Sequence, residues 1–230
     1  MQLSADAVSV LLIVAVSALL VGTGLRKQPG IGAVASILLI VGALWFRGES
    51  PSAIGFGLPE DWGETALLGF AYAALLQLLA VTLVGPLSEK LTGTEHDHSV
   101  FDGVRGNGRV MLQWLALVWT LVVFLEEGIF RGFLMTEIVK IAGTGMLALC
   151  FNVLFTSVVF GLAHGYQNRS GMVSAGMVGL FLGALFIFEG FNLWLVIFVH
   201  GFVDTIGIVL IAAGADRSID GFIRRKLWRI

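Results

Sequence analysis

The stretch Leu115–Met135 reads LALVWTLVVFLEEGIFRGFLM and decides the fold. It is long and apolar enough for a membrane span, yet it holds three charged side chains, Glu126, Glu127 and Arg131. Each charge near the centre of a transmembrane helix costs about 2.5–3.5 kcal/mol on insertion scales. A chain keeps such groups only if they pair, face a wet cavity or carry out chemistry. The stretch therefore predicts a membrane protein with a polar site in its interior.

The composition extends this interpretation to the whole chain. Of its 230 residues, 57% are hydrophobic and only 13% are charged, and the mean hydropathy is +0.92. Soluble domains carry about 25% charged residues, so the sequence predicts an all-α, polytopic transmembrane helical bundle. No second domain is evident, and we expect one integral membrane domain over residues 1–230. The single cysteine, Cys150, excludes an intrachain disulfide.

Apolar segments long enough to cross a bilayer, about 20 residues each, recur along the chain. We expect about seven spans, at residues 5–25, 30–46, 64–86, 110–138, 143–165, 172–189 and 192–214. The first has no basic region before it, so we interpret it as a retained span rather than a signal peptide. The fourth is too long for a perpendicular helix, so it should tilt or begin as an interfacial segment. The longest polar loop is expected at residues 87–109.

Basic residues set the expected orientation, because they collect on the cytoplasmic side of membrane proteins. With the N-terminus outside, eleven Lys and Arg residues fall in cytoplasmic segments and two, Arg47 and Lys140, fall in outer loops. The sequence thus favours an N-out/C-in orientation. Five of the eleven lie in the cytoplasmic tail, and its segment 224–229 either anchors the topology or lies on anionic lipid. Nothing in the sequence indicates nucleic-acid binding.

The sixth span carries a small residue at every fourth position, Gly171, Ala175, Gly179 and Gly183. These residues share one helix face and allow a neighbouring helix to approach closely. Tight packing is the simpler interpretation, and a substrate groove along that face is the alternative.

The charged residues of the fourth span do not all have a partner. Glu127 and Arg131 are four residues apart, so they share a helix face and can form an ion pair. Glu126 and Arg131 are five residues apart, about 140° around the helix axis, which leaves Glu126 without a local partner. A carboxyl group in that position suits a general base or acid. A buried network of all three residues without any chemistry explains the motif equally well.

Two further motifs place titratable groups in later spans. The fifth span ends in Phe160-Gly161-Leu162-Ala163-His164, and the seventh contains His200-Gly201-Phe202-Val203-Asp204. His200 and Asp204 are four residues apart, so Asp204 can orient or charge His200. Either motif alone fits a structural hydrogen bond. Their joint occurrence favours a site, because a network that only stabilised the fold would not need a carboxylate and two imidazoles from three separate spans.

The three motifs, in this order, resemble the CPBP family of intramembrane proteases, which includes the CAAX prenyl endopeptidases and bacterial relatives linked to bacteriocin self-immunity. The family pattern is E-E-x-x-x-R, F-x-x-x-H and H-x-x-x-N/D on three transmembrane helices, and the resemblance covers about residues 109–214. It implies an endopeptidase, hence a hydrolase, in the cell (inner) membrane of a prokaryote. The partners it implies are the lipid bilayer and, as substrate, a membrane protein or a lipidated peptide.

The resemblance also implies a role for each motif residue. Glu126 would activate water, His164 would hold and polarise that water, and His200 with the residue four positions later would stabilise the oxyanion. The supporting residues would be Glu127, Arg131 and Phe160.

The third motif departs from the prenyl endopeptidases, which usually carry Asn where this chain has Asp204. An amide donates a hydrogen bond to an oxyanion, whereas an ionised carboxylate does not. Asp204 would therefore act when protonated, or act by keeping His200 charged and oriented. Bacterial relatives also carry Asp at this position, so the difference argues only against assuming a CAAX substrate.

We expect no metal and no other cofactor. Two Glu and two His residues could ligate zinc, but the H-E-x-x-H arrangement is absent. The resemblance implies a glutamate-dependent enzyme, although the family has long been classed among the metalloendopeptidases. The sequence His96-Asp97-His98 is expected to be a solvated loop rather than a metal site.

Two other functions compete with proteolysis. One is a non-proteolytic membrane scaffold or bacteriocin self-immunity protein with the same fold, in which the polar cluster only stabilises the bundle. The other is a proton-coupled transporter, which is disfavoured because the chain shows no inverted repeat and no pair of spans broken by proline.

Overall fold

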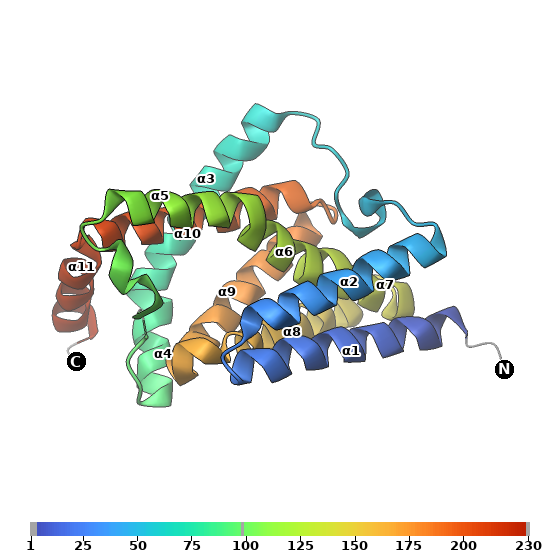
Figure 1. Cartoon of the computed structure of the whole chain (residues 1–230), viewed down its shortest axis with the longest axis horizontal. Helices are drawn as coiled ribbons and strands as arrows, with labels where there is room; N and C mark the ends of the chain where they lie inside the picture. The colour runs from blue at the N-terminus through green and yellow to red at the C-terminus, as the bar shows by residue number, and fades with distance from the viewer. Residues whose placement is uncertain (1–3, 98, 229–230) are drawn as a thin grey trace.

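A computed structural model describes residues 4–97 and 99–228, which form a bundle of helices without any strand (Figure 1). Within this part of the chain, seven helices are long and apolar enough to cross a membrane. They are Ala5–Leu25, Pro29–Arg47, Trp62–Thr92, Gly108–Ala142, Met146–Ala163, Gly165–Phe188 and Leu193–Ala212. The predicted all-α transmembrane bundle with seven spans is therefore confirmed.

Several spans consist of more than one helical element. The elements of the first three spans and the loop after them are α1 (Ala5–Leu25), α2 (Pro29–Arg47), η1 (Pro51–Ile54), α3 (Trp62–Leu79), η2 (Ala80–Val84), α4 (Gly85–Thr92) and η3 (Ser99–Val104). The fourth span comprises α5 (Gly108–Leu117), η4 (Val118–Val122), α6 (Val123–Glu127), η5 (Gly128–Met135) and α7 (Thr136–Ala142). The remaining elements are α8 (Met146–Ala163), η6 (Gly165–Gln167), α9 (Asn168–Phe188), α10 (Leu193–Ala212), α11 (Ala215–Ile223) and η7 (Arg224–Trp228). Elements η2, η4, η5 and η7 are π-helical, and η1, η3 and η6 are 3-10 turns.

The predicted loop at residues 87–109 was wrong in its first part. Helix α4 continues to Thr92, and residues 99–104 form the 3-10 turn η3. Pro86 does not end the helix, because the π-helical turn η2 directly before it accommodates the missing backbone N–H. The polar residues after Pro86 are thus the end of a helix that extends beyond its apolar part.

Polar side chains and glycines define the helix ends. Asp61 accepts hydrogen bonds from two backbone N–H groups at the start of α3, and Asn107 caps α5 in the same way. Asn192 caps α10 and also donates to the Gly57 carbonyl, which fixes the loop before α3 to the start of α10. Gly48 and Gly93 end α2 and α4 in the left-handed conformation that favours glycine.

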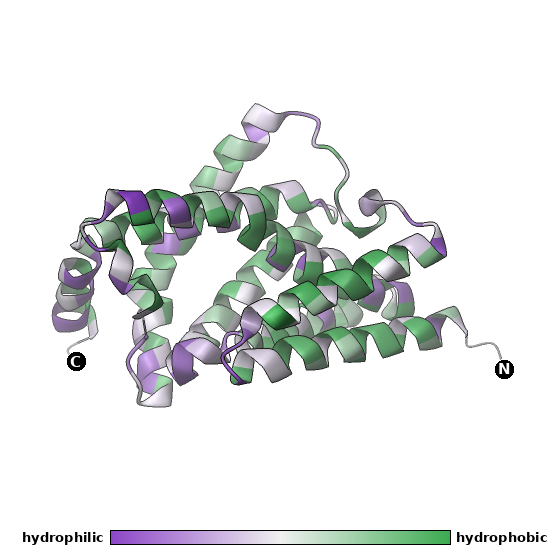
Figure 2. Cartoon of the chain, in the orientation of Figure 1, coloured by the Kyte–Doolittle hydropathy of each residue, from purple (hydrophilic) through white to green (hydrophobic). Residues whose placement is uncertain are grey.

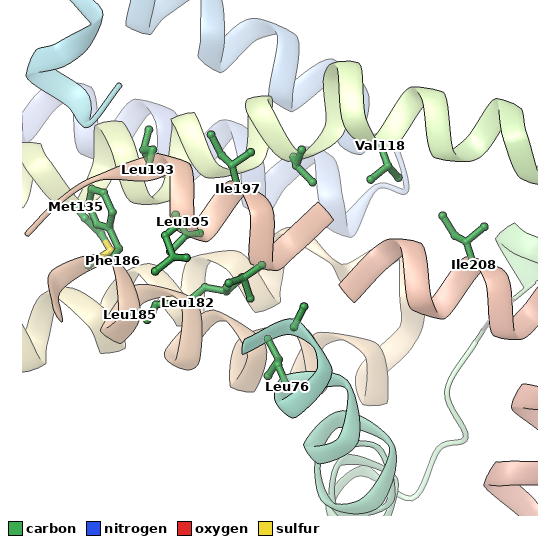
Figure 3. Close-up of a cluster of buried hydrophobic side chains, with 14 of the residues drawn as sticks. Leu76, Val118, Met135, Leu182, Leu185, Phe186, Leu193, Leu195, Ile197 and Ile208 are labelled. Carbon is green, nitrogen blue, oxygen red and sulfur yellow. The ribbon is translucent and has the colours of Figure 1, made fainter. Parts of the chain in front are cut away.

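The fourth span is the centre of the bundle. One cluster of buried hydrophobic side chains joins it to α3, α9 and α10, and Figure 3 shows Val118 and Met135 of the fourth span among Leu76, Phe186 and Ile197. A second cluster joins the same span to α1, α2 and α8. All eight residues of η5 are buried. The segment that carries the Glu pair therefore contributes to the packing on both sides.

The outer surface of the bundle is apolar, as a lipid environment requires. Large side chains such as Trp45 and Phe46 are 86% and 91% exposed, and Figure 2 shows hydrophobic residues along most of α1 and α2. Hydrophilic residues gather towards the ends of the bundle, at α4, α11 and the start of α5 (Figure 2). The two termini lie at opposite ends, as an odd number of spans requires (Figure 1).

Candidate active site

The two adjacent carboxylates of the first motif occupy different environments. Glu126 and Glu127 end the short helix α6, between the π-helical segments η4 and η5. Such π-helical turns are rare and often occur at functional sites. The Glu127 side chain is fully buried, whereas the Glu126 side chain is 23% exposed. Glu127 can therefore contact only other groups of the protein, whereas Glu126 can also contact a ligand.

Glu127 joins the fourth span to α10 through one oxygen atom, and its partner Arg131 extends this network to α9. Its Oε1 accepts a hydrogen bond from Arg131 Nη1 at 3.0 Å, which is the i, i+4 pair predicted from the sequence. The same oxygen lies 2.6 Å from His200 Nδ1 on α10. Arg131 Nη2 also donates to the Gly179 carbonyl on α9 at 3.3 Å. The pair predicted within one helix is therefore the centre of a network between helices.

The position of His200 is set by Glu127 rather than by Asp204. Since Nδ1 is directed to Glu127, Nε2 faces Glu126 Oε2 and Asp204 Oδ2, each 3.8 Å away. Both distances exceed that of a hydrogen bond. The orienting contact that the sequence suggested for Asp204 is made instead by a residue 73 positions away, which helical spacing alone could not show.

His164 approaches Glu126 from the end of α8. Its Nδ1 lies 2.8 Å from the Phe160 carbonyl oxygen, so Nδ1 carries the proton and donates it to that oxygen. Its Nε2 lies 4.0 Å from Glu126 Oε2. Glu126 therefore faces the Nε2 atoms of two imidazoles at nearly equal distances, and Asp204 stands beside one of them. The structure brings together the four residues that the motifs suggested from three separate spans.

Phe160, the first residue of the second motif, forms a wall shared by these groups. Its ring packs edge-on against Phe130 at 4.8 Å between centroids and lies 4.4 Å from the His164 ring. The Arg131 guanidinium lies 4.6 Å from the same ring, a distance typical of a cation–π contact. Phe160 thus holds Arg131 and His164 in place from one side.

A small cavity opens beside Glu126 and His164. Its volume is about 40 Å³, and its polar lining consists of Glu126, His164 and Tyr166. The remaining lining residues are apolar and come from α1, α2, η5 and α8: Leu20, Pro29, Ala33, Ile129, Phe130 and Ala163. The first two spans, which carry none of the motifs, therefore form one side of the site.

Trp119 is a site neighbour that the sequence did not reveal. Its indole Nε1 donates to Thr205 Oγ1 at 2.9 Å, and its ring packs against Gly201 so closely that a Cβ there would lie 2.6 Å from a ring carbon. Gly201 follows His200 directly. The glycine in the third motif is therefore needed for the close approach of Trp119, and a small residue next to a motif histidine was the available signal.

A second buried carboxylate was also missed, although it lies in the same span. Glu137 is fully buried, and its Oε1 accepts hydrogen bonds from Arg47 Nη1 and Lys140 Nζ, both at 2.8 Å. Lys140 Nζ lies 2.9 and 3.1 Å from the two Glu49 carboxylate oxygens, and Arg47 Nη2 donates to Ser9 Oγ at 3.1 Å. We refer to Ser9, Arg47, Glu49, Glu137 and Lys140 as the Glu137 cluster. It fastens α1 and α2 to α7.

Among residues 4–97 and 99–228, no three His, Cys, Asp or Glu side chains have an arrangement that could hold a metal ion. In the suggested loop motif, His98 lies outside the described residues.

Two surface predictions can be compared with the structure. Gly179 and Gly183 of the small-residue stripe lie within van der Waals distance of α8, which supports tight packing rather than a groove along that face.

In the basic tail, Arg224 pairs with Glu89 at 2.6 Å and with Asp220 at 2.7 Å. Trp228 Nε1 donates to the Thr82 carbonyl, so the tail packs on η2 and α4.

Comparison with known proteins agrees with the region that contains the site. Residues 108–206 match the family model described as type II CAAX prenyl endopeptidase Rce1-like. No curated protein and no solved structure gives a significant match. Members of the matched family are proteases, and all three motifs lie within the matched residues. This region is thus Rce1-like, which confirms the resemblance to the CPBP intramembrane proteases that the three motifs predicted.

Proposed function

We propose that this chain is a glutamate-dependent intramembrane endopeptidase in which Glu126 activates a water molecule. The observation that carries the proposal is the pair of distances from Glu126 Oε2 to the two imidazole Nε2 atoms, 4.0 Å to His164 and 3.8 Å to His200. They are too long for direct hydrogen bonds and suit groups bridged by one small molecule. The adjacent cavity of about 40 Å³ has room for a water molecule, and its polar lining offers partners to it.

The two ring nitrogens of His164 have different hydrogen-bond partners in this mechanism. Because His164 Nδ1 donates to the Phe160 carbonyl, its Nε2 accepts a hydrogen bond from the water. The Glu126 carboxylate accepts the other proton of the water as the oxygen attacks the scissile carbonyl, and later returns that proton to the leaving amine. The peptide bond is thereby hydrolysed without a change in the net charge of the site.

His200 would stabilise the oxyanion of the tetrahedral intermediate. Glu127 holds Nδ1 at 2.6 Å, so Nε2 of the cationic ring is directed into the site as a donor. Asp204 Oδ2, 3.8 Å from Nε2, supports the charged ring. This arrangement gives Asp204 a role that does not require it to donate a hydrogen bond.

The substrate we propose is a membrane protein or a lipidated peptide. The catalytic groups lie on transmembrane spans, and one side of the cavity is formed by α1 and α2. A substrate that partitions into the bilayer reaches such a site more readily than a soluble peptide does. From the resemblance to the CPBP proteases we propose the inner membrane of a prokaryote as the location, and from the distribution of Lys and Arg residues we propose N-out/C-in as the orientation.

The test is cleavage of a library of membrane peptides by the purified protein in detergent. Wild type, Glu126→Gln and the control Glu64→Gln, an exposed carboxylate at the start of α3, are compared with and without a chelator. We expect cleavage by wild type and Glu64→Gln, none by Glu126→Gln, and no effect of the chelator. Unchanged cleavage by Glu126→Gln contradicts the proposed mechanism. Absence of cleavage by a folded wild type favours the scaffold or self-immunity function.

A further inference from the structure

Tyr166 is the one polar group lining the cavity that the three motifs do not include. It lies in the 3-10 turn η6, two residues after His164, and its ring packs at 33° and 5.6 Å against the His164 imidazole. The His164 ring in turn packs against Phe160 at 4.4 Å. The imidazole is thus held between two aromatic rings, and only one of them carries a hydroxyl group.

The end of α1 fixes the turn that carries Tyr166. A Cβ on Gly24 would lie 2.1 Å from the Ala163 carbonyl oxygen, and a Cβ on Gly165 would lie 2.8 Å from the Leu25 side chain. These two contacts lie immediately before and after His164 in the sequence. Since a side chain at Gly24 would overlap the Ala163 backbone, α1 lies directly against the chain next to the turn that carries Tyr166.

The hydroxyl group of Tyr166 has one hydrogen-bond partner and can use another. Its oxygen accepts a hydrogen bond from Gln167 Nε2 at 3.1 Å. Tyr166 lines the same cavity as Glu126 and His164, and the Glu126 and Asp204 carboxylates interact electrostatically with its hydroxyl group. In the described part of the chain, no acceptor takes the hydroxyl proton in a hydrogen bond, so this proton is available to a molecule in the cavity.

We propose that Tyr166 positions the hydrolytic water by donating a hydrogen bond to its oxygen; this inference rests on the proposed function. A water that gives its protons to Glu126 and to His164 Nε2 keeps two lone pairs. One attacks the scissile carbonyl, and the other accepts from the Tyr166 hydroxyl. As Glu126 removes a proton, the water oxygen gains negative charge, and the Tyr166 donor stabilises it. Buried waters make about three hydrogen bonds, and Tyr166 supplies the third.

The experiment compares Tyr166→Phe with wild type on the membrane peptide that wild type cleaves. Phe keeps the ring against His164 and removes only the hydroxyl group. We expect kcat to fall about 10- to 100-fold, below the 10²–10³ typical of a lost oxyanion donor, while KM stays within about twofold. Tyr72→Phe is the matched control, because Tyr72 is the other tyrosine of the chain and packs against Phe181, away from the site. It should leave both parameters unchanged.

Each outcome separates this inference from the proposed function. If Glu126→Gln is inactive and Tyr166→Phe has the wild-type kcat, or raises only KM, Tyr166 does not position the water. If Glu126→Gln remains active, the proposed mechanism fails and this inference fails with it. Should Tyr166→Phe not fold, Gln167→Leu removes the bond that orients the hydroxyl group. A kcat reduced about two- to fivefold then supports the inference, and an unchanged kcat overturns it.

Discussion

The fourth span carries two buried acidic centres that differ in how completely their charges are paired. In the Glu137 cluster, every contact between opposite charges is 2.8–3.1 Å long, and two carboxylates face two permanent cations. The centre at Glu126 holds three carboxylates, those of Glu126, Glu127 and Asp204, and one permanent cation, Arg131, which is paired with Glu127. The contacts of Glu126 itself are 3.8 and 4.0 Å. A cluster of short ion pairs stabilises the fold, whereas an open cluster has room for a reacting molecule.

The comparison also separates the two members of the Glu pair. Glu127 behaves like Glu137, because it is fully buried and makes short contacts to two donors. Glu126 is partly exposed and is bound directly to neither imidazole. We therefore expect that neutralising Glu126 lowers the reaction rate, whereas neutralising Glu137 lowers the stability of the fold.

The largest effect is expected for Glu126→Gln. The amide cannot take a proton from water, so kcat should fall about 10²–10⁴-fold, the range of a lost general base. The thermal unfolding temperature in detergent should fall little, because Glu126 makes no direct hydrogen bond to either imidazole. If the variant lost both its fold and its activity, Glu126 would stabilise the fold as Glu137 does, and the proposed difference between the two residues would be wrong.

Glu127→Gln should combine both effects, because this residue serves the network and the site. The change leaves Arg131 buried without its carboxylate and replaces the charged acceptor of His200 Nδ1 with a neutral one. Removing one member of a buried ion pair costs about 3–5 kcal/mol, and the reaction rate should fall about 10²-fold because the negative charge that orients and supports the cationic His200 ring is lost. Chemical unfolding and kcat, measured on the same preparation, check the two parts. An unchanged unfolding free energy would show that Arg131 finds another partner.

Glu137→Gln should lower stability and leave the reaction rate unchanged. The amide keeps a hydrogen-bond acceptor but loses the charge between Arg47 and Lys140, for which we expect about 1.5–3 kcal/mol. Both cations are partly exposed, so water compensates for some of the loss. The readouts are the unfolding free energy and the kcat of the folded fraction, which should stay within about threefold. A larger fall in kcat would show that the Glu137 cluster acts on the site through the helix between them.

Helical spacing shows why the sequence predicted part of the site and not the rest. Seven spans followed from hydropathy, and the Glu127–Arg131 pair followed from a spacing of four residues within one helix. The contact between Glu127 and His200 joins two spans whose rotation about their own axes is set by packing, so no local pattern encodes it. Glu137 lies in a segment recognised as a span, but its partner Arg47 is 90 residues away.

The residues that line the cavity could not be predicted from the sequence for a similar reason. Leu20, Pro29 and Ala33 are ordinary residues of apolar spans and acquire a role only because Gly24 allows α1 to contact the end of α8. Tyr166 stands two residues after a motif histidine, yet a tyrosine near a helix end is common in membrane proteins. Its relation to Glu126 depends on the turn η6, which hydropathy does not predict.

The smallest effect is expected for Asp204→Asn, which tests how far the open centre depends on its third carboxylate. Asp204 Oδ2 lies 3.8 Å from His200 Nε2, and Glu127 alone makes the hydrogen bond that orients the ring. An amide keeps the shape of the side chain and can donate to an oxyanion, so kcat should stay within about tenfold of wild type. Asp204→Ala, which removes the polar group altogether, should lose more activity than the amide variant. Asp220→Asn serves as a control, because Asp220 pairs with Arg224 in the tail. If Asp204→Asn were as inactive as Glu126→Gln, the negative charge beside Nε2 would itself be required, and His200 would depend on both of its flanking carboxylates rather than on Glu127 alone.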